Sequence, residues 1–278
     1  MTAHDEIAQG WSDVADGWSQ RRSEIERMKE PVTARMLDWL ALSDGDAVYE
    51  AGAGTGELAR RLAAVVGPGG RVVATDVAPN MVELVRAATA TESNVLVRQA
   101  DATGTGEADS AYDAVVFRMG LMLVPNPADA LRELRRILRP GGRLAAATWG
   151  APEHNPWLTS VGMSLMMHGA VTGGPPVGPG GVFSLDDPSA LANLAADAGL
   201  VDVTVEAVDV TVSFPDVDGY LAQVSGCAPM LAGALAALDD ERREAVRATV
   251  AQAVERFRTA DGLALPGRAL LLLAGRPE

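Results

Sequence analysis

Three glycines at alternate positions follow a short apolar stretch that ends in an acid. The stretch 47–50 ends at Glu50, and Gly52, Gly54 and Gly56 follow directly before a helical pattern. Glycine permits positive φ and lets a ligand approach bare backbone. The start of a helix offers unpaired N–H groups to electronegative ligand atoms. The stretch therefore predicts the mouth of a nucleotide-type pocket.

Two aspartates follow at the ends of the next two apolar stretches. Asp76 comes twenty residues after Gly56, and Asp101 is followed by Ala102. A carboxylate at the position of Asp76 can accept hydrogen bonds from a ribose diol. Asp101 and the N–H of Ala102 can read an adenine edge. Either aspartate alone could be a turn cap, but together with the glycine turn they favour an adenosine ligand.

The spacing of the glycines also separates this turn from that of dinucleotide-binding enzymes. Those enzymes use G-x-G-x-x-G, whereas this chain has G-x-G-x-G with Glu50 two residues upstream. An acid at that place would repel a pyrophosphate. It suits a ligand that carries a cationic amino group.

Alternating strand and helix patterns position these residues. Strands are expected at 47–50, 71–76, 94–101, 112–118 and 143–149, and helices at 57–66, 79–90 and 127–138. Valine- and alanine-rich strands separated by helices predict a parallel sheet covered on both faces. Ligands of such sheets bind at the carboxyl ends of the strands. We expect four parts in the chain: a helical cap (1–42), a binding core (43–150), a lid (151–185), and a completion of the sheet with a helical substrate cover (186–278).

Composition excludes several classes of partner. The chain has 278 residues with 23 Lys and Arg against 37 Asp and Glu, for a net charge of −14. Such an acidic chain without a basic tract is a poor binder of nucleic acid. Cys227 is its single cysteine, and no ligand spacing suggests a metal site. The N-terminus is unlike a secretory signal and the apolar runs are too short to span a membrane. We expect a cytoplasmic protein, monomeric or homodimeric.

Several segments resemble class I S-adenosylmethionine-dependent methyltransferases. They are EAGAGTG (50–56), ATDVAPNMVELVR (74–86), QAD (99–101), YDAVVFRMGLMLVPNP (112–127) and ALRELRRILRPGGRLAAATWG (130–150). The nearest likeness is to the small-molecule branch related to ubiquinone/menaquinone-biosynthesis C-methyltransferases. The clear resemblance covers about 47–150, and HNPWL (154–158) and the final LPGRALLLLAGRP look like actinobacterial members.

The resemblance implies a fold and a cofactor. The fold is α/β, a Rossmann-like, doubly wound, seven-stranded and mostly parallel sheet. Its last strand, expected at 268–274 beside 200–212, is antiparallel, and N-terminal helices and an inserted helical lid complete it. The cofactor is S-adenosylmethionine, with S-adenosylhomocysteine as product. The residues implied to bind it are Glu50, Ala51, Gly52, Gly54, Gly56, Asp76, Val77, Met81, Asp101, Ala102 and Arg118.

One departure from the family leaves the catalytic group open. Many relatives carry an acid and two histidines, or an aromatic pair, after the fourth strand, where this chain has Arg118-Met119-Gly120. The candidates for catalysis are then His168, His154 and Arg118, although either histidine could be structural. Residues expected to face the acceptor come from the first helix, the fourth strand end and the lid. They are Trp11, Trp18, Met119, Leu123, Trp157, Met163, Met167 and Phe183.

The expected function is methyl transfer to O, C or N of a small, largely apolar metabolite in natural product biosynthesis. In-line transfer mainly requires alignment and exclusion of water. Two alternatives stay open. The same fold could bind the cofactor for a non-methylating reaction such as a cyclisation, or the chain could be a non-catalytic cofactor-binding partner subunit.

Overall fold

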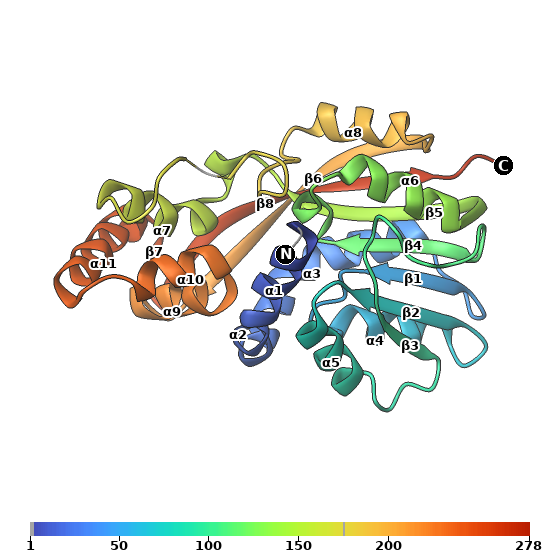
Figure 1. The fold of residues 1–278 in the computed structure, drawn as a ribbon, viewed down its shortest axis with the longest axis horizontal. Coiled ribbons are helices and arrows are strands. Elements are labelled where there is room, and N and C mark those ends of the chain that lie inside the picture. Colours follow the sequence, from blue (N-terminus) through green and yellow to red (C-terminus); the bar gives the residue numbers. More distant parts are fainter. Residues whose placement is uncertain (1–2, 175) are drawn as a thin grey trace.

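A computed structural model of the protein describes residues 3–174 and 176–278. One mixed sheet runs through the molecule in the order β3-β2-β1-β4-β5-β8-β6, and a short β7 pairs with β8 (Figure 1). Its strands are β1 Ala47–Ala51, β2 Arg71–Asp76, β3 Val95–Gln99, β4 Tyr112–Arg118, β5 Leu138–Trp149, β6 Val201–Phe214, β7 Arg258–Thr259 and β8 Gly262–Gly275. The central strands are rich in Val and Ala and are buried along most of their length, as expected for a sheet covered on both faces.

The strand directions confirm the predicted fold class. β1 to β5 pair in parallel, whereas β8 pairs antiparallel with both β5 and β6. The reversed strand was expected at 268–274 and observed at Gly262–Gly275. The sheet has eight strands rather than seven because the two residues of β7 add a short pair to β8.

Helices cover both faces of the sheet. In Figure 1, α6 (Pro127–Ile137) and α8 (Pro188–Asp197) lie over one face, and α3 (Arg22–Leu40) and α4 (Glu57–Val66) lie behind the other. α5 (Pro79–Ala88) packs against α4, β2 and β3. The apolar stripe of α4 is fully buried while its arginines face outward, which is the amphipathic pattern of a surface helix.

A second lobe is built on the outer halves of β6 and β8. Their pairing continues past the end of β5 to Phe214 and Leu263. This extension carries α7 (Pro156–Met167), α9 (Val217–Cys227), α10 (Pro229–Ala236) and α11 (Asp240–Val254), seen at the left of Figure 1. α11 ends at Val254, and the chain continues as a 3₁₀ turn, Glu255–Phe257.

The N-terminal segment joins the core to the second lobe. It forms two short helices, α1 (Ala3–Asp13) and α2 (Ala15–Gln20), within the helical cap expected over 1–42. α2 lies directly against α9: a Cβ on Gly17 would meet the carbonyl oxygen of Gly226 at 1.8 Å. Trp18 Nε1 donates to the carbonyl of Cys227 at 2.9 Å.

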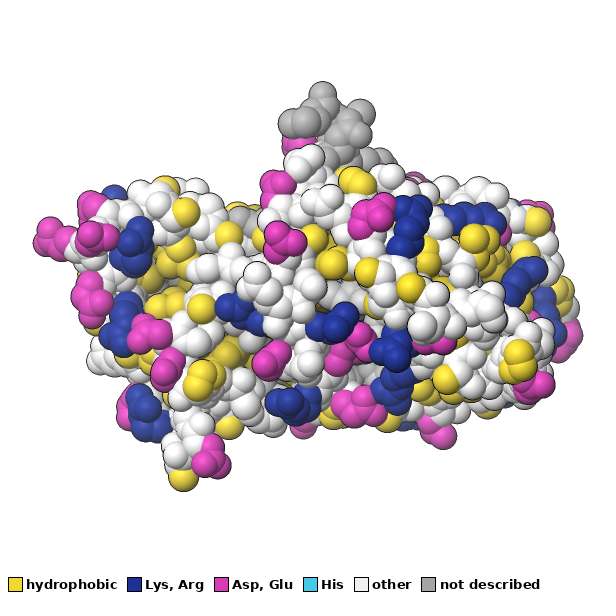
Figure 2. Space-filling view, turned by 90° about the horizontal axis from the view of Figure 1, so that it is seen from below, with side chains coloured by type: hydrophobic (Ala, Val, Ile, Leu, Met, Phe, Trp, Pro, Cys, Tyr) yellow, Lys and Arg dark blue, Asp and Glu magenta, His cyan; other side chains and the backbone are white. Residues whose placement is uncertain are grey.

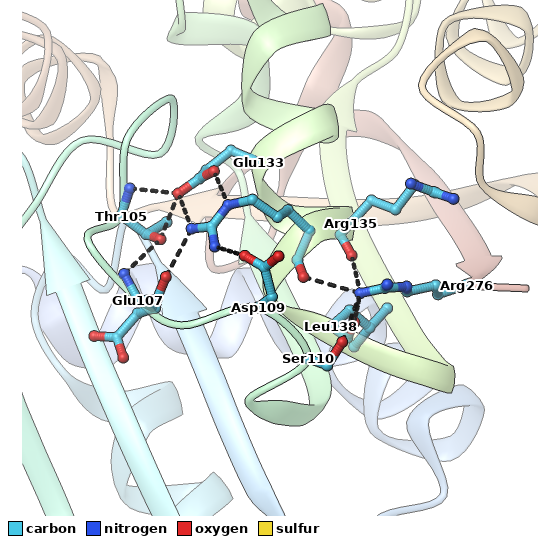
Figure 3. Close-up of polar contacts among 9 residues, drawn as sticks. Thr105, Glu107, Asp109, Ser110, Glu133, Arg135, Leu138 and Arg276 are labelled. Atoms are coloured by element: carbon cyan, nitrogen blue, oxygen red, sulfur yellow. Dashed lines mark hydrogen bonds and ion pairs between the residues drawn. The ribbon is translucent and has the colours of Figure 1, made fainter. Parts of the chain in front are cut away.

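A network on α6 fixes the glycine-rich loop that follows β3. Figure 3 shows a carboxylate of Glu133 accepting hydrogen bonds from the Thr105 N–H and hydroxyl, at 2.9 and 2.7 Å. Arg136 donates to both Glu133 oxygens and to the carbonyl of Glu107. Hydrogen bonds from Arg136 and from Thr105 outweigh the opposing effect of burial and lower the pKa of Glu133 to about 2. The loop after Asp101 is therefore held in place without regular structure.

The surface mixes charges of both signs. In Figure 2, Arg side chains and Asp and Glu side chains are interspersed over the visible face. In the described part of the chain, no helix has the length and apolar character needed to cross a bilayer. The same residues hold no group of three or more His, Cys, Asp or Glu side chains arranged as a metal site.

Candidate cofactor and acceptor site

A hollow lies at the carboxyl ends of β1, β2 and β4. It measures about 1040 Å³, including the part open to solvent. The glycine turn, the end of β2, the segment after β3 and the segment after β4 form its core side. Helices α1, α2 and α3 close it from outside. The position agrees with the rule that parallel sheets bind ligands at their carboxyl edge.

The three glycines of the turn have different surroundings. All have positive φ, of 62°, 59° and 82° for Gly52, Gly54 and Gly56. No atom lies within 4 Å of a Cβ built on Gly54, which lines the hollow. A Cβ on Gly56 would instead meet Val85 Cα and Ala88 Cβ at 3.0 Å. Gly54 thus leaves room for a ligand, whereas Gly56 allows α4 to approach α5.

The carboxylate of Asp76 is oriented by two backbone N–H groups. Its Oδ2 accepts from Gly54 at 3.0 Å and its Oδ1 from Ala78 at 3.0 Å. Burial raises the pKa of this carboxyl, and the backbone hydrogen bonds oppose that rise. Asp76 lines the hollow and each oxygen keeps a further acceptor position. It can therefore accept hydrogen bonds from a diol.

Asp101 and Ala102 line the same hollow, at the start of the glycine-rich loop that Glu133 and Arg136 hold in place. Oδ1 of Asp101 accepts from the N–H and the hydroxyl of Thr103, both at 2.7 Å. The aspartate is thus a turn cap as well as a pocket residue. Val77 and Met81 also line the hollow, on the β2 side.

Glu50 is a buried acid at the base of the turn. It is 2% exposed, and its Oε2 has no hydrogen-bond partner among the described residues. Burial raises the pKa of Glu50 to about 8. A buried carboxylate oxygen without a donor is costly unless a ligand supplies one. Glu50 is not among the described residues that line the hollow, so its role in binding the amino group of a methionine moiety stays a prediction.

Arg118 is held by helix α3. Its guanidinium donates to both carboxylate oxygens of Glu26 at 2.7 Å and to the Thr33 hydroxyl at 2.7 Å. Although burial alone would raise it, the pKa of Glu26 is lowered by Lys29 and Arg118. Arg118 lines the hollow, yet much of its donor capacity is directed at α3, which the sequence patterns did not reveal. A catalytic or cofactor-binding role for Arg118 stays a prediction.

Lys29 is a pocket residue that sequence reasoning missed. It lines the hollow and is only 7% exposed. Its Nζ lies 3.7 Å from Glu26 Oε1 and 4.9 Å from the centroid of the Trp18 ring. Burial, with Arg118 next, lowers the pKa of Lys29 to about 8. One sequence signal could have found it, because Lys29 is the only lysine of the chain, whereas the other 22 basic residues are arginines.

Four of the predicted acceptor-facing residues line the hollow. Trp11 and Trp18 meet edge to face with ring centroids 5.9 Å apart, and they pack on Ala78 and Met81. Met119 and Leu123 lie opposite, after β4. The N-terminal helices therefore both dock on the core and cover the hollow.

The other four predicted acceptor-facing residues lie outside the lining of the hollow, as far as the described residues show. Phe183 is 1% exposed within the main core, and Trp157 packs on Trp149 with ring centroids 5.0 Å apart. Met163 and Met167 are 40% and 71% exposed on α7. The physical reason is the long extension of β6 and β8, on which α7 packs against α11 and β8.

Neither predicted histidine lines the hollow among the described residues. His168 Nε2 lies 2.8 Å from the Thr249 hydroxyl, at the contact of α7 with α11. His154 lies in the 3₁₀ turn Pro152–His154, in a separate surface hollow with Asp209 and Arg268. Since neither histidine lines the hollow, proton transfer by His154 or His168 stays a prediction without support from the lining.

The fold and the site define a Rossmann-like α/β protein with an adenosine-type pocket. Residues 49–146 match the family model described as a methyltransferase domain. The resemblance expected from the sequence is confirmed over this region. It coincides with the strands and turns that form the core side of the hollow.

Part of the chain is also similar in sequence to curated methyltransferases. The ubiquinone/menaquinone biosynthesis C-methyltransferase UbiE of Ectopseudomonas mendocina is 38% identical over 120 residues, which are 42% of this chain and 46% of that protein. The chain thus spans about half the length of the curated relatives it matches.

Solved structures share the fold over more of the chain. A putative methyltransferase from Bacillus halodurans aligns with a TM-score of 0.58 at 17% identity, covering 88% of this chain and 99% of that one. The [4+2]-cyclase SpnF aligns with a TM-score of 0.52 at 22% identity, covering 88% and 80%. At these identities the likeness concerns the fold alone.

Proposed function

We propose that this protein transfers the methyl group of S-adenosylmethionine to a small, largely apolar acceptor. The observation that carries the proposal is the glycine turn with its two carboxylates. Gly54 leaves open space, backbone donors orient Asp76, and Glu50 holds a buried oxygen without a hydrogen-bond partner among the described residues. These three groups suit a ribose and a cationic amino group at one strand edge.

Each of these residues would bind a different part of the cofactor. Asp76 would accept the ribose hydroxyls, Asp101 and Ala102 would read the adenine edge, and Glu50 would accept from the amino group. When bound, S-adenosylmethionine supplies a methyl group already activated by a sulfonium. The chain has only to bind, align the acceptor and exclude water.

The acceptor side of the hollow favours an apolar, flat molecule. Its lining includes the rings of Trp11 and Trp18 and the side chains of Ile7, Leu123 and Val124. Aromatic side chains stack well on planar ligands. A polyketide, terpenoid, quinone or aromatic metabolite fits this lining. We place the reaction in natural product biosynthesis, in a cytoplasmic protein that is a monomer or homodimer.

Calorimetry with S-adenosylhomocysteine tests the cofactor site. We expect micromolar binding by the wild type and at least a roughly tenfold weaker affinity for Asp76→Ala, because losing charge-assisted hydrogen bonds costs about 1.5–3 kcal/mol. Asp129→Ala is the matched control, since Asp129 is exposed on α6 and pairs only with neighbours there. Equal affinity of Asp76→Ala and wild type would remove the assignment.

The alternative function is a reaction without methyl transfer, such as a cyclisation, and the fold shared with a [4+2]-cyclase favours considering it. In a repurposed enzyme the cofactor would stay intact while the acceptor is converted. Mass spectrometry of a reaction with wild-type protein, labelled S-adenosylmethionine and metabolite extract separates the two. Label that moves to an acceptor, with matching S-adenosylhomocysteine, supports methyl transfer. Acceptor conversion with no label transfer supports the repurposed reading.

A further inference from the structure

Lys29 has an unusual place in the charge distribution of this chain. The chain uses arginine at 22 of its 23 basic positions and lysine only here. Arginine keeps its proton under all conditions relevant to a protein, whereas a buried lysine can lose it. Among the 23 lysines and arginines, only Lys29 can therefore lose its proton and act as a base, and Lys29 lines the hollow.

The neighbours of Lys29 favour the neutral amine in the resting site. The strong acceptor on its own helix, Glu26, is engaged with Arg118 at 2.7 Å through both oxygens, and Lys29 Nζ is farther from it at 3.7 Å. The positive charge of Arg118 on β4 disfavours a second cation nearby. Burial acts in the same direction.

Other groups around Lys29 favour the ammonium once it forms. The acidic groups that oppose Arg118 are Glu26 on α3 and Glu50 on β1, whereas burial raises the pKa of the Cys227 thiol to about 11 and keeps it neutral. The face of the Trp18 ring lies 4.9 Å from Nζ and attracts a cation. The amine can therefore accept a proton and hold it within the site.

We propose that the Lys29 amine is the proton acceptor of the reaction, taking the proton of an acidic hydroxyl, that of a phenol or an enol, on the acceptor bound in the hollow. The proposal rests on the methyl transfer proposed above. It assigns to α3 the base that the histidines do not supply.

The step balances in atoms and charge. The O–H bond of the acceptor breaks, its proton goes to Nζ, and its electron pair stays on the acceptor. The new bond to the methyl carbon forms from that pair, at oxygen or at the conjugated carbon. The C–S bond of the sulfonium donor breaks at the same time, and its pair goes to sulfur. The products are the methylated acceptor, a neutral thioether and the Lys29 ammonium.

The pKa of Lys29 limits which hydroxyl groups of the methyl acceptor it can deprotonate. Phenolic groups have a pKa of about 10 in water, and an adjacent base works best when its own pKa is near the working pH. The pKa of Lys29, lowered to about 8, meets that requirement. Simple alcohols are far too weak as acids for an amine base, so the inference narrows the acceptor to acidic hydroxyls.

The single lysine allows a direct test. Protein labelled with 13C at lysine Cε gives one signal, whose shift reports the protonation of Nζ. We expect a midpoint near pH 8 in the wild type, and a rise of that midpoint when 2-naphthol is added to protein saturated with S-adenosylhomocysteine. An Arg132→Lys variant adds an exposed lysine on α6 as an internal reference, which should titrate near 10.4. A Lys29 midpoint equal to the reference, or one that 2-naphthol leaves unchanged, would overturn the proposal.

Substitution separates the chemical role from packing. Lys29→Met keeps an unbranched stem, and Lys29→Arg keeps the charge but cannot release a proton. Both should bind S-adenosylhomocysteine as the wild type does. Both should methylate 2-naphthol at least about a hundredfold more slowly and lose much less rate with 2,4-dinitro-1-naphthol, which is already ionised and needs no base. Equal losses on both naphthols would contradict a base and indicate packing. Absence of S-adenosylhomocysteine binding by wild type would instead refute the proposed function, whatever the Lys29 midpoint.

Discussion

The carboxyl group of Glu50 connects the stability of the protein to its ligand site. It is buried near Arg118, Lys29 and Asp76, and one of its oxygens has no partner among the described residues. Such a group favours its neutral form until a cation arrives to pair with it. The same residue therefore destabilises the empty protein above neutral pH and is the acceptor that we propose for the amino group of the ligand.

Replacing Glu50 with Gln should raise stability and weaken binding. The folded pKa of about 8 lies above the unfolded value near 4.5. The folded state therefore holds an extra proton between these values, and wild-type stability falls as the pH rises through that window. Glu50→Gln removes this slope, so the stability advantage of the variant should grow from almost nothing at pH 4.5 to on the order of 4 kcal/mol at pH 8. Urea unfolding at several pH values measures it, with exposed Glu83→Gln as control. A variant less stable than wild type at pH 8 would mean that Glu50 is ionised and paired in the fold.

At the scale of elements, the turn between β1 and α4 separates two uses of glycine that look identical in sequence. Gly54 faces open space, and Gly56 faces the backbone of α5. Both carry positive φ, so alanine at either place costs about 1 kcal/mol of backbone strain. Only Gly56→Ala adds a steric clash in a packed contact, and only Gly54→Ala fills the hollow.

The two alanine variants should accordingly fail in different ways. Gly54→Ala should unfold only slightly below the wild-type temperature but lose S-adenosylhomocysteine binding by at least about tenfold, because the Cβ occupies ligand space. Gly56→Ala should lose more stability, on the order of 2 kcal/mol or more, as overpacked contacts do. Thermal unfolding and calorimetry on both proteins check this. Similar losses of stability in both variants would mean that Gly54 also serves packing.

The elements also show which parts of the fold the sequence could predict. The strands of the core were predictable because each is a short apolar run that ends in a polar residue, as at Asp76. Three features were not. The outward reach of β6 and β8 is a tertiary register, which moves Met163 and Met167 away from the hollow. The pairing of Arg118 with Glu26 joins residues 92 apart in the chain. Lys29 was hidden in a polar stretch of a helix, where a lysine ordinarily faces solvent.

At the scale of the whole molecule, the N-terminal helices α1 and α2 cover the outer side of the hollow. They contact the core through Trp11 and Trp18 and the second lobe through the close approach of Gly17 to Gly226.

A side chain at Gly17 cannot fit, since its Cβ would lie 1.8 Å from a backbone oxygen. α2 must then leave α9, while β1 to β5 keep all their contacts. Gly17→Ala should therefore raise amide exchange in residues 6–20 by at least about tenfold and leave the central strands protected, because local opening is independent of global unfolding. Gly233→Ala in α10 is the matched control, as no atom lies within 4 Å of its Cβ. α1 and α2 cover the part of the hollow where we place the methyl acceptor, whereas the carboxylates proposed to bind S-adenosylhomocysteine lie on the core strands. Gly17→Ala should therefore also weaken the binding of 2-naphthol more than the binding of S-adenosylhomocysteine. Equal weakening of both ligands would show that the N-terminal helices hold the cofactor as well as the acceptor.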